Sequence, residues 1–99
     1  MRREHAIASL RQCKAQLAAL GVRGLYLYGS VARDQARPGS DVDLLVEARD
    51  GSFTIFDLAL VRDALLQVLK SPVDVHDYGG YLRLPAFRAS LGSDIVRVF

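Results

Sequence analysis

The sequence has few of the residues that indicate a disulfide-stabilised or membrane-spanning protein. Its 99 residues include one cysteine and no tryptophan, and they contain no apolar run of the roughly 18 residues that a membrane helix needs. A single cysteine excludes an internal disulfide and favours a reducing compartment. The charged first residues are not followed by the continuous apolar run of a signal peptide. We therefore expect a cytoplasmic protein that does not enter the membrane.

A strong charge of one sign is also missing. The chain has 13 basic and 11 acidic residues, a formal net charge of +2, which is too small to indicate nucleic-acid binding. No basic groove with stacking aromatic residues stands out either, so polynucleotide is not an expected ligand. The hydrophobic share is 51%, although so short a chain has little interior. Some apolar side chains should lie on the surface, where an interface with a partner protein would use them.

Length and periodicity predict one domain, residues 1–99, with alternating helices and strands. Cys13 lies on the apolar stripe of the first predicted helix, which favours a core residue over a nucleophile. Thr54 and Asp57 resemble a capping box at the start of the second long helix. The order of elements predicts an α/β or α+β sandwich. We expect helices at 3–20, 53–69 and 84–91, a helical turn at 31–35, and strands at 25–28, 41–46, 73–76 and 94–99.

Two aspartates mark the predicted strand 41–46. Asp41 and Asp43 are two residues apart, so their side chains should share one face of the strand, about 7 Å apart. Neighbouring carboxylates repel each other unless a cation or protons lie between them. Magnesium prefers such oxygen ligands and completes its shell with water and phosphate. By itself the pair is also typical of a solvated strand end.

Two further features belong to neighbouring strands. Gly29 and Ser30 follow a strand and begin a helical turn, where a glycine lets an anion approach the backbone amides; the same dipeptide is also ordinary turn chemistry. Asp74 interrupts an apolar strand that we expect to be central, where an unpaired carboxylate would be costly to bury. Alternation places His76 on the same face, either at the rim of a site or as a solvated strand-end residue.

Together these features resemble the nucleotidyltransferase fold shared with DNA polymerase beta, and in particular the minimal nucleotidyltransferases of prokaryotes. Many of those act as antitoxins beside a helical HEPN-type RNase toxin. The resemblance covers nearly the whole chain and implies a mixed sheet of about four strands packed with helices. It rests on three segments: Leu-Tyr-Gly-Ser-Val-Ala-Arg at 27–33, Ser-Asp-Val-Asp-Leu-Leu-Val at 40–46, and Val-Asp-Val at 73–75.

The resemblance also implies a site. Asp41, Asp43 and Asp74 would hold two magnesium ions against ATP, Gly29 and Ser30 would fix its terminal phosphates, and Asp74 would help the attacking hydroxyl lose its proton. Arg33 is either a clamp on the triphosphate or a surface ion pair with Asp34 or another carboxylate. Members commonly carry glycine where this chain has Asp34, which would alter the turn or add a charge near the phosphates.

The acceptor is the part that the sequence describes least. Too few residues remain for a second domain that would bind a template or primer, so a partner protein is the expected source of the hydroxyl. By resemblance this partner is the cognate HEPN-type toxin, which would receive AMP on a side chain such as tyrosine. Two alternatives stay open. One is an antitoxin that masks its toxin without catalysis, and the other is nucleotidyl transfer to a small molecule.

Overall fold

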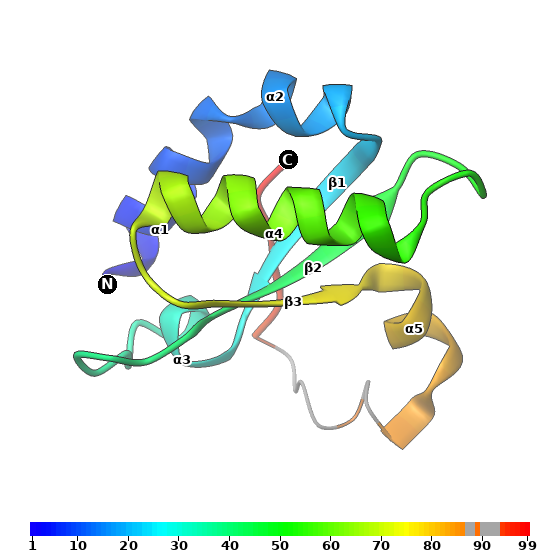
Figure 1. Cartoon of the computed structure of the whole chain (residues 1–99). Coiled ribbons are helices and arrows are strands. Elements are labelled where there is room, and N and C mark those ends of the chain that lie inside the picture. The colour runs from blue at the N-terminus through cyan, green and yellow to red at the C-terminus, as the bar shows by residue number, and fades with distance from the viewer. Residues whose placement is uncertain (87–88, 90–93) are drawn as a thin grey trace.

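The computed structural model of the chain describes residues 1–86, 89 and 94–99. Its elements alternate between helices and strands, as the sequence predicts (Figure 1). The helices are α1 Arg3–Gln12, α2 Lys14–Ala19, α3 Gly29–Ala32, α4 Ile55–Leu69 and α5 Tyr78–Arg83. The strands are β1 Val22–Tyr28, β2 Val42–Ala48, β3 Val73–Asp77 and β4 Val96–Arg97. Among the described residues, no helix is long and apolar enough to cross a membrane.

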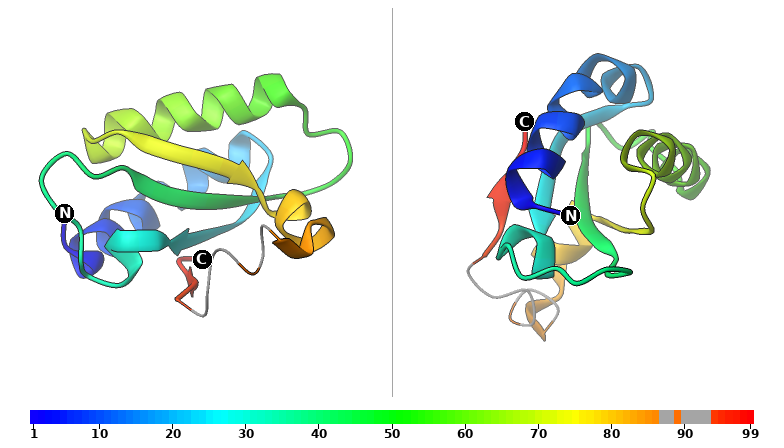
Figure 2. Two further views of the ribbon diagram at one scale, coloured as in Figure 1. Left: turned by 90° about the horizontal axis from the view of Figure 1, so that it is seen from below. Right: turned by 90° about the vertical axis from the view of Figure 1, so that its left-hand side faces the viewer.

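The strands form one mixed sheet in the order β3-β2-β1-β4. β1 pairs antiparallel with β2 and with β4, whereas β2 and β3 are parallel. The right-hand view of Figure 2 shows α4 packed alongside this sheet. A four-stranded mixed sheet packed with helices confirms the predicted fold class. One expectation was wrong: β3, which carries Asp74, is an edge strand and not a central one.

The main core lies between one face of the sheet and helices α1, α2 and α4. Alternate residues of β2, Val42, Leu44 and Val46, point into this core and are almost completely buried. Leu65 of α4 and Leu10 of α1 pack against them in the same cluster. The opposite face has a smaller buried cluster, formed by Tyr26, Tyr28 and Leu45. The strand period of two therefore separates the face under α1, α2 and α4 from the opposite face. We call the latter the open face because none of these three helices covers it, although Tyr78 of α5 packs against its small cluster.

Hydrogen bonds explain one helix boundary that the sequence predicts and one that it does not. The capping box at the start of α4 is confirmed, since the Asp57 amide donates to Thr54 Oγ1 and the Thr54 amide donates to the Asp57 carboxylate. The predicted helix 3–20 is divided at Cys13, whose amide bonds to Leu10 three residues back. Cys13 is buried in the core, as predicted, and burial raises the pKa of its thiol.

The C-terminal part differs most from the predicted elements. Gly79 and Gly80 lie inside the short helix α5, where a loosened chain was expected. Much of the predicted helix 84–91 lies outside the described residues. The predicted strand 94–99 is shorter in the structure, where β4 is Val96–Arg97. Backbone bonds between Leu25 and both Val98 and Phe99 prolong its pairing with β1.

Large apolar side chains are exposed mainly along α4. Ile55 and Phe56 are 76% and 79% exposed, and Leu60 on the same helix is 54% exposed. Leu84, directly after α5, is also exposed. The expectation that part of the apolar surplus lies on the surface is therefore confirmed. Its use as a partner interface stays a prediction.

Candidate active site

Three side chains form a row across the open face of the sheet. The parallel pairing of β2 with β3 sets Asp43 directly opposite Asp74, and the pairing of β1 with β2 sets Tyr28 opposite Asp43. Residues that are opposite each other on neighbouring strands have their Cβ atoms about 5 Å apart. Asp41 lies just before β2 and is exposed. The fold thus brings together the three aspartates that the sequence singles out, although Asp41 precedes the strand instead of belonging to it.

Negative charge is concentrated at Asp43. Burial, followed by the carboxylates of Asp74 and Asp41, raises the pKa of Asp43, while His76 and Arg33 act in the opposite direction. Burial, together with Asp43 and Asp74, also raises the pKa of Tyr28, so this phenol stays protonated beside the carboxylates. A cation placed among these oxygens would relieve the repulsion.

Gly29 lies directly beneath the Asp43 carboxylate. Its φ of +76° is in the left-handed region that favours glycine. A Cβ atom at this position would also collide with Asp43 Oδ2. Glycine is therefore favoured here for two reasons, its backbone conformation and the close approach of Asp43. Ser30 follows within α3 and is half-buried. Phosphate binding by Gly29 and Ser30 stays a prediction, but the fold does place this dipeptide at the carboxylates.

Arg33 and Asp34 lie just beyond α3 and are both exposed. The Arg33 guanidinium pairs with Asp94, with Nη1 3.9 Å from Oδ2, and its Nε donates to Gln35 Oε1 at 3.3 Å. Asp34 adopts a φ of +57°, and its carboxylate accepts the backbone N–H of Arg3 at 3.1 Å. The left-handed backbone explains why glycine suits this position. The Asp34 carboxylate is directed to the start of α1, and the clamp role of Arg33 stays a prediction.

Two further residues, His76 and Tyr28, lie beside the site. The sequence indicates the first only weakly and the second not at all. His76 Nε2 lies 3.2 Å from Asp74 Oδ1, so the strand alternation that placed both side chains on one face correctly signalled their proximity. Tyr28 gives no such signal, because its position depends on the register between β1 and β2.

The carboxylates of the site are ligands of the kind that magnesium prefers. Among the described residues, no group of three or more His, Cys, Asp or Glu side chains is arranged as a preformed metal site. Magnesium does not require one, because it takes one or two carboxylates together with water and substrate phosphates. The paired Asp43 and Asp74, with Asp41 nearby, supply such carboxylates. The magnesium set of Asp41, Asp43 and Asp74 stays a prediction.

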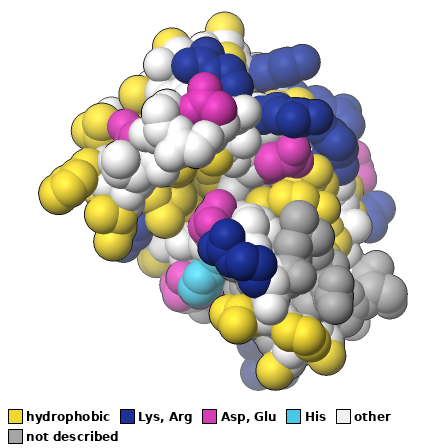
Figure 3. All heavy atoms as spheres, turned by 90° about the vertical axis from the view of Figure 1, so that its right-hand side faces the viewer, with side chains coloured by type: hydrophobic (Ala, Val, Ile, Leu, Met, Phe, Trp, Pro, Cys, Tyr) yellow, Lys and Arg dark blue, Asp and Glu magenta, His cyan; other side chains and the backbone are white. Residues whose placement is uncertain are grey.

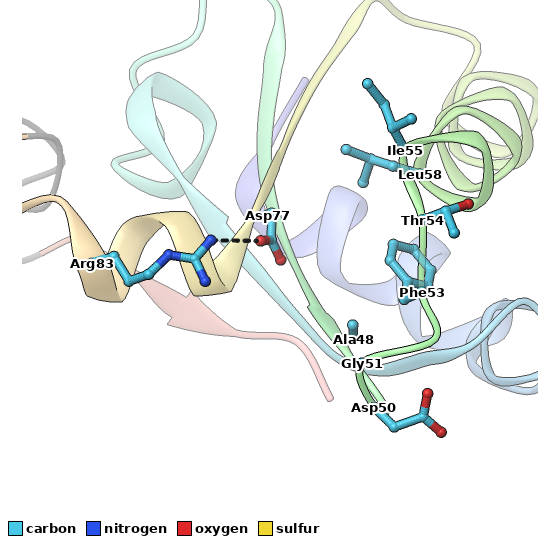
Figure 4. Close-up of a pocket in the computed structure, with 9 residues that line it drawn as sticks. All are labelled: Ala48, Asp50, Gly51, Phe53, Thr54, Ile55, Leu58, Asp77 and Arg83. Carbon is cyan, nitrogen blue, oxygen red and sulfur yellow. Dashed lines mark ion pairs between the residues drawn. The ribbon is translucent and has the colours of Figure 1, made fainter.

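A pocket of about 440 Å³ lies at the other end of the strands (Figure 4). Phe53, Ile55 and Leu58 line it, and the ion pair between Asp77 and Arg83 forms its opposite wall. Figure 3 shows this side of the molecule, where apolar side chains are exposed beside charged ones. The pocket adjoins the C-terminal ends of β2 and β3, whereas the aspartates are at their N-terminal ends. It is therefore separate from the carboxylate row.

Known proteins resemble this chain in both sequence and fold. The family model described as "Nucleotidyltransferase domain" matches residues 10–97. A Methanocaldococcus jannaschii protein named "Putative protein adenylyltransferase" is 38% identical over 58 residues. That match covers 59% of this chain and 61% of the relative, so less than two thirds of the relative is matched.

Two solved structures share the fold over nearly the whole chain. One, described as a "putative minimal nucleotidyltransferase", has 31% identity and a TM-score of 0.71, and the match covers 97% of this chain and 95% of that one. The other is a complex of a tri-AMPylated Shewanella oneidensis HEPN toxin with an MNT antitoxin. It has 15% identity and a TM-score of 0.64, and the match covers 98% of this chain and 71% of that one. The chain therefore belongs to the nucleotidyltransferase domain family and, within it, to the minimal nucleotidyltransferases.

Proposed function

We propose that this chain transfers AMP from ATP to a hydroxyl group of a partner protein, a HEPN-type toxin, and thereby acts as an antitoxin. The observation that carries the proposal is the register of the sheet, which sets Asp43 beside Asp74 on the open face, directly above Gly29. This row joins a carboxylate pair to a glycine whose backbone the Asp43 carboxylate approaches closely. Nucleotidyl transfer needs such a combination, because a polyphosphate and its cations must approach the backbone closely.

Five residues of the site would have separate roles in the reaction. Asp41, Asp43 and Asp74 would hold two magnesium ions, which neutralise charge on the triphosphate when bound. Gly29 and Ser30 would bind the terminal phosphates. The acceptor oxygen forms a bond to the α-phosphorus, while the bond from that phosphorus to the bridging oxygen breaks and pyrophosphate leaves. The acceptor proton passes to the Asp74 carboxylate.

Asp74 suits the acceptor side because it lies on an edge strand. Its side chain is 51% exposed, and among the described strands only β2 pairs with β3. A side chain presented by another protein can therefore reach Asp74 from the free edge of β3. Asp43 is enclosed between β1 and β3 and is less exposed, which suits a residue that faces the nucleotide.

A protein acceptor is supported by the comparisons and by the surface. The name of the M. jannaschii relative refers to protein adenylylation, and the S. oneidensis complex contains a HEPN toxin that carries AMP. The apolar side chains exposed on α4 offer area for contact with a protein. A HEPN-type toxin is the acceptor that these observations favour.

The proposal is tested with the partner protein itself. The chain is co-produced with a candidate HEPN-type partner protein, and the partner is examined by mass spectrometry for the added mass of AMP. We expect the adduct with the wild-type chain and none with Asp74→Asn, although this variant should still bind much of the nucleotide. In cells, Asp74→Asn should bind the toxin and fail to protect against it.

The opposite outcome would identify an antitoxin that acts by masking. If folded Asp74→Asn protects cells as well as the wild type and the partner carries no adduct in either case, the transferase proposal is wrong. A nucleotide adduct on a small molecule, with none on the partner, would instead favour the alternative acceptor class.

A further inference from the structure

His76 contacts Asp74 but has no role in the reaction proposed above. The two residues are two positions apart on β3, and strand alternation brings both side chains to the open face. Nε2 of His76 lies 3.2 Å from Oδ1 of Asp74, within hydrogen-bond distance of an N–H donor. In the sheet register His76 lies opposite Leu45, one pleat further along than the pair of Asp43 and Asp74. Asp74 therefore has two neighbours on this face: the His76 imidazole on the same strand, and Asp43 directly opposite on β2.

Asp74 is a carboxylate whose direction needs to be fixed. It is half exposed on an edge strand and lies beside the like charge of Asp43. Like charges separate where they can, and an exposed Asp side chain can rotate among its staggered conformations. A donor on Oδ1 restricts this rotation and leaves Oδ2 for another ligand. Positioning of this kind matters in catalysis, because a displacement of about 1 Å can slow a reaction by about a hundredfold.

We infer that His76 is a positioning residue, which donates to Asp74 Oδ1 and holds this carboxylate toward the acceptor hydroxyl. The inference rests on the proposed function, since it assigns Asp74 the acceptor side of the reaction. His76 does not contact the reacting atoms itself. Its contribution to folding stability is small, because solvent screens a pair in which the side chains are 42% and 51% exposed. Loss of the imidazole should therefore affect the rate of transfer and leave the fold intact.

Three variants separate positioning from other roles. His76→Ala removes the donor, His76→Gln keeps an N–H donor of similar reach, and His5→Ala removes the other histidine, which is exposed on α1. Transfer to the co-produced partner protein should show a kcat about tenfold lower for His76→Ala, with an unchanged KM for ATP. His76→Gln should recover most of the rate, and His5→Ala should equal the wild type. Thermal melting should be the same for all three variants and the wild type.

A measurement without ATP or partner examines the contact directly. The chain has only two histidines, so their ring proton resonances are readily assigned by NMR. Asp74→Asn should shift the His76 resonances and leave those of His5 in place. Unmoved His76 resonances would overturn the contact on which the inference depends.

The kinetic outcomes distinguish this inference from the proposed function. A wild-type rate for His76→Ala, in a chain that transfers AMP normally, overturns the positioning role and leaves the proposed function standing. A His76→Gln variant as slow as His76→Ala also overturns it, because the donor would then not be the group that matters. A wild-type chain that transfers no nucleotide overturns both.

Discussion

The two faces of the sheet are built from the same strands and have opposite properties. On β2, Val42, Leu44 and Val46 are buried beneath the helices, whereas Asp43 between them is only partly buried on the open face. β3 repeats the pattern, with Val73 in the core and Asp74 exposed. The face under α1, α2 and α4 therefore contains the main core, whereas the open face combines a smaller buried cluster with unfavourable charge. Adjacent residues of one strand should consequently respond to mutation in different ways.

The largest expected effect belongs to the open face. Asp43→Asn should lower the rate of AMP transfer by about a thousandfold or more, because it removes a carboxylate that would hold magnesium against the nucleotide. The melting temperature of the ligand-free variant should equal or exceed that of the wild type, since repulsion from Asp74 and Asp41 is relieved. Asp63→Asn makes the same change at an exposed position on α4 and should alter neither quantity. A much lower melting temperature for Asp43→Asn would instead indicate a structural carboxylate.

The next residue along the strand should give the reverse result. Leu44 is fully buried under the helices, so Leu44→Ala should lower the free energy of unfolding by about 2–5 kcal/mol, as measured in urea. The fraction that remains folded should keep its transfer activity, because Leu44 faces away from the site. Leu60→Ala is the matched control, since Leu60 is 54% exposed on α4 and should change stability by no more than about 0.5 kcal/mol. Equal losses in the two variants would contradict the division into two faces.

Much of this comparison could be predicted from the sequence, because strand alternation is a local property. Alternation alone indicated that Asp74 and His76 share a face, and the Thr54–Asp57 box marked the start of α4 correctly. Strand order is not local, which is why the edge position of β3 was missed. The row from Tyr28 to Asp74 likewise depends on the register between strands, which no single segment contains. Helix α5 was missed because two adjacent glycines normally weaken a helix.

A smaller effect is expected at Gly29, which follows β1 and begins α3. Gly29→Ala should cost about 1–3 kcal/mol of stability, because alanine is strained at a φ of +76°. It should also reduce transfer, since the new Cβ displaces the Asp43 carboxylate. Gly39→Ala provides the control: Gly39 has a φ of +86° but no atom within 4 Å of an added Cβ. Similar destabilisation of both variants, with transfer lost only at Gly29, would confirm that the Asp43 contact is the cause.

The smallest effect concerns the open face at high pH. Burial, and then the hydrogen bond from the Tyr26 hydroxyl to Glu47 at 2.8 Å, raises the pKa of Tyr26 to about 12. The unfolded chain releases this proton near pH 10, its ordinary value. Folding therefore opposes ionisation, and the stability that the neutral phenol contributes is present below about pH 10 and is lost as the pH rises toward about 12.

Tyr26→Phe should remove this part of the pH dependence. At neutral pH the variant should lose only about 1 kcal/mol, the usual worth of one hydrogen bond. Between about pH 10 and 12 its free energy of unfolding should fall less steeply than that of the wild type, by up to about 1.4 kcal/mol per pH unit for one proton. Urea unfolding at a series of pH values measures both slopes, and every other titrating group is common to the two proteins. Equal slopes would show that Tyr26 ionises as readily in the folded chain as in the unfolded one. The difference in slope therefore tests whether the small cluster of Tyr26, Tyr28 and Leu45 disfavours a charged Tyr26, although charged side chains lie nearby on the same face.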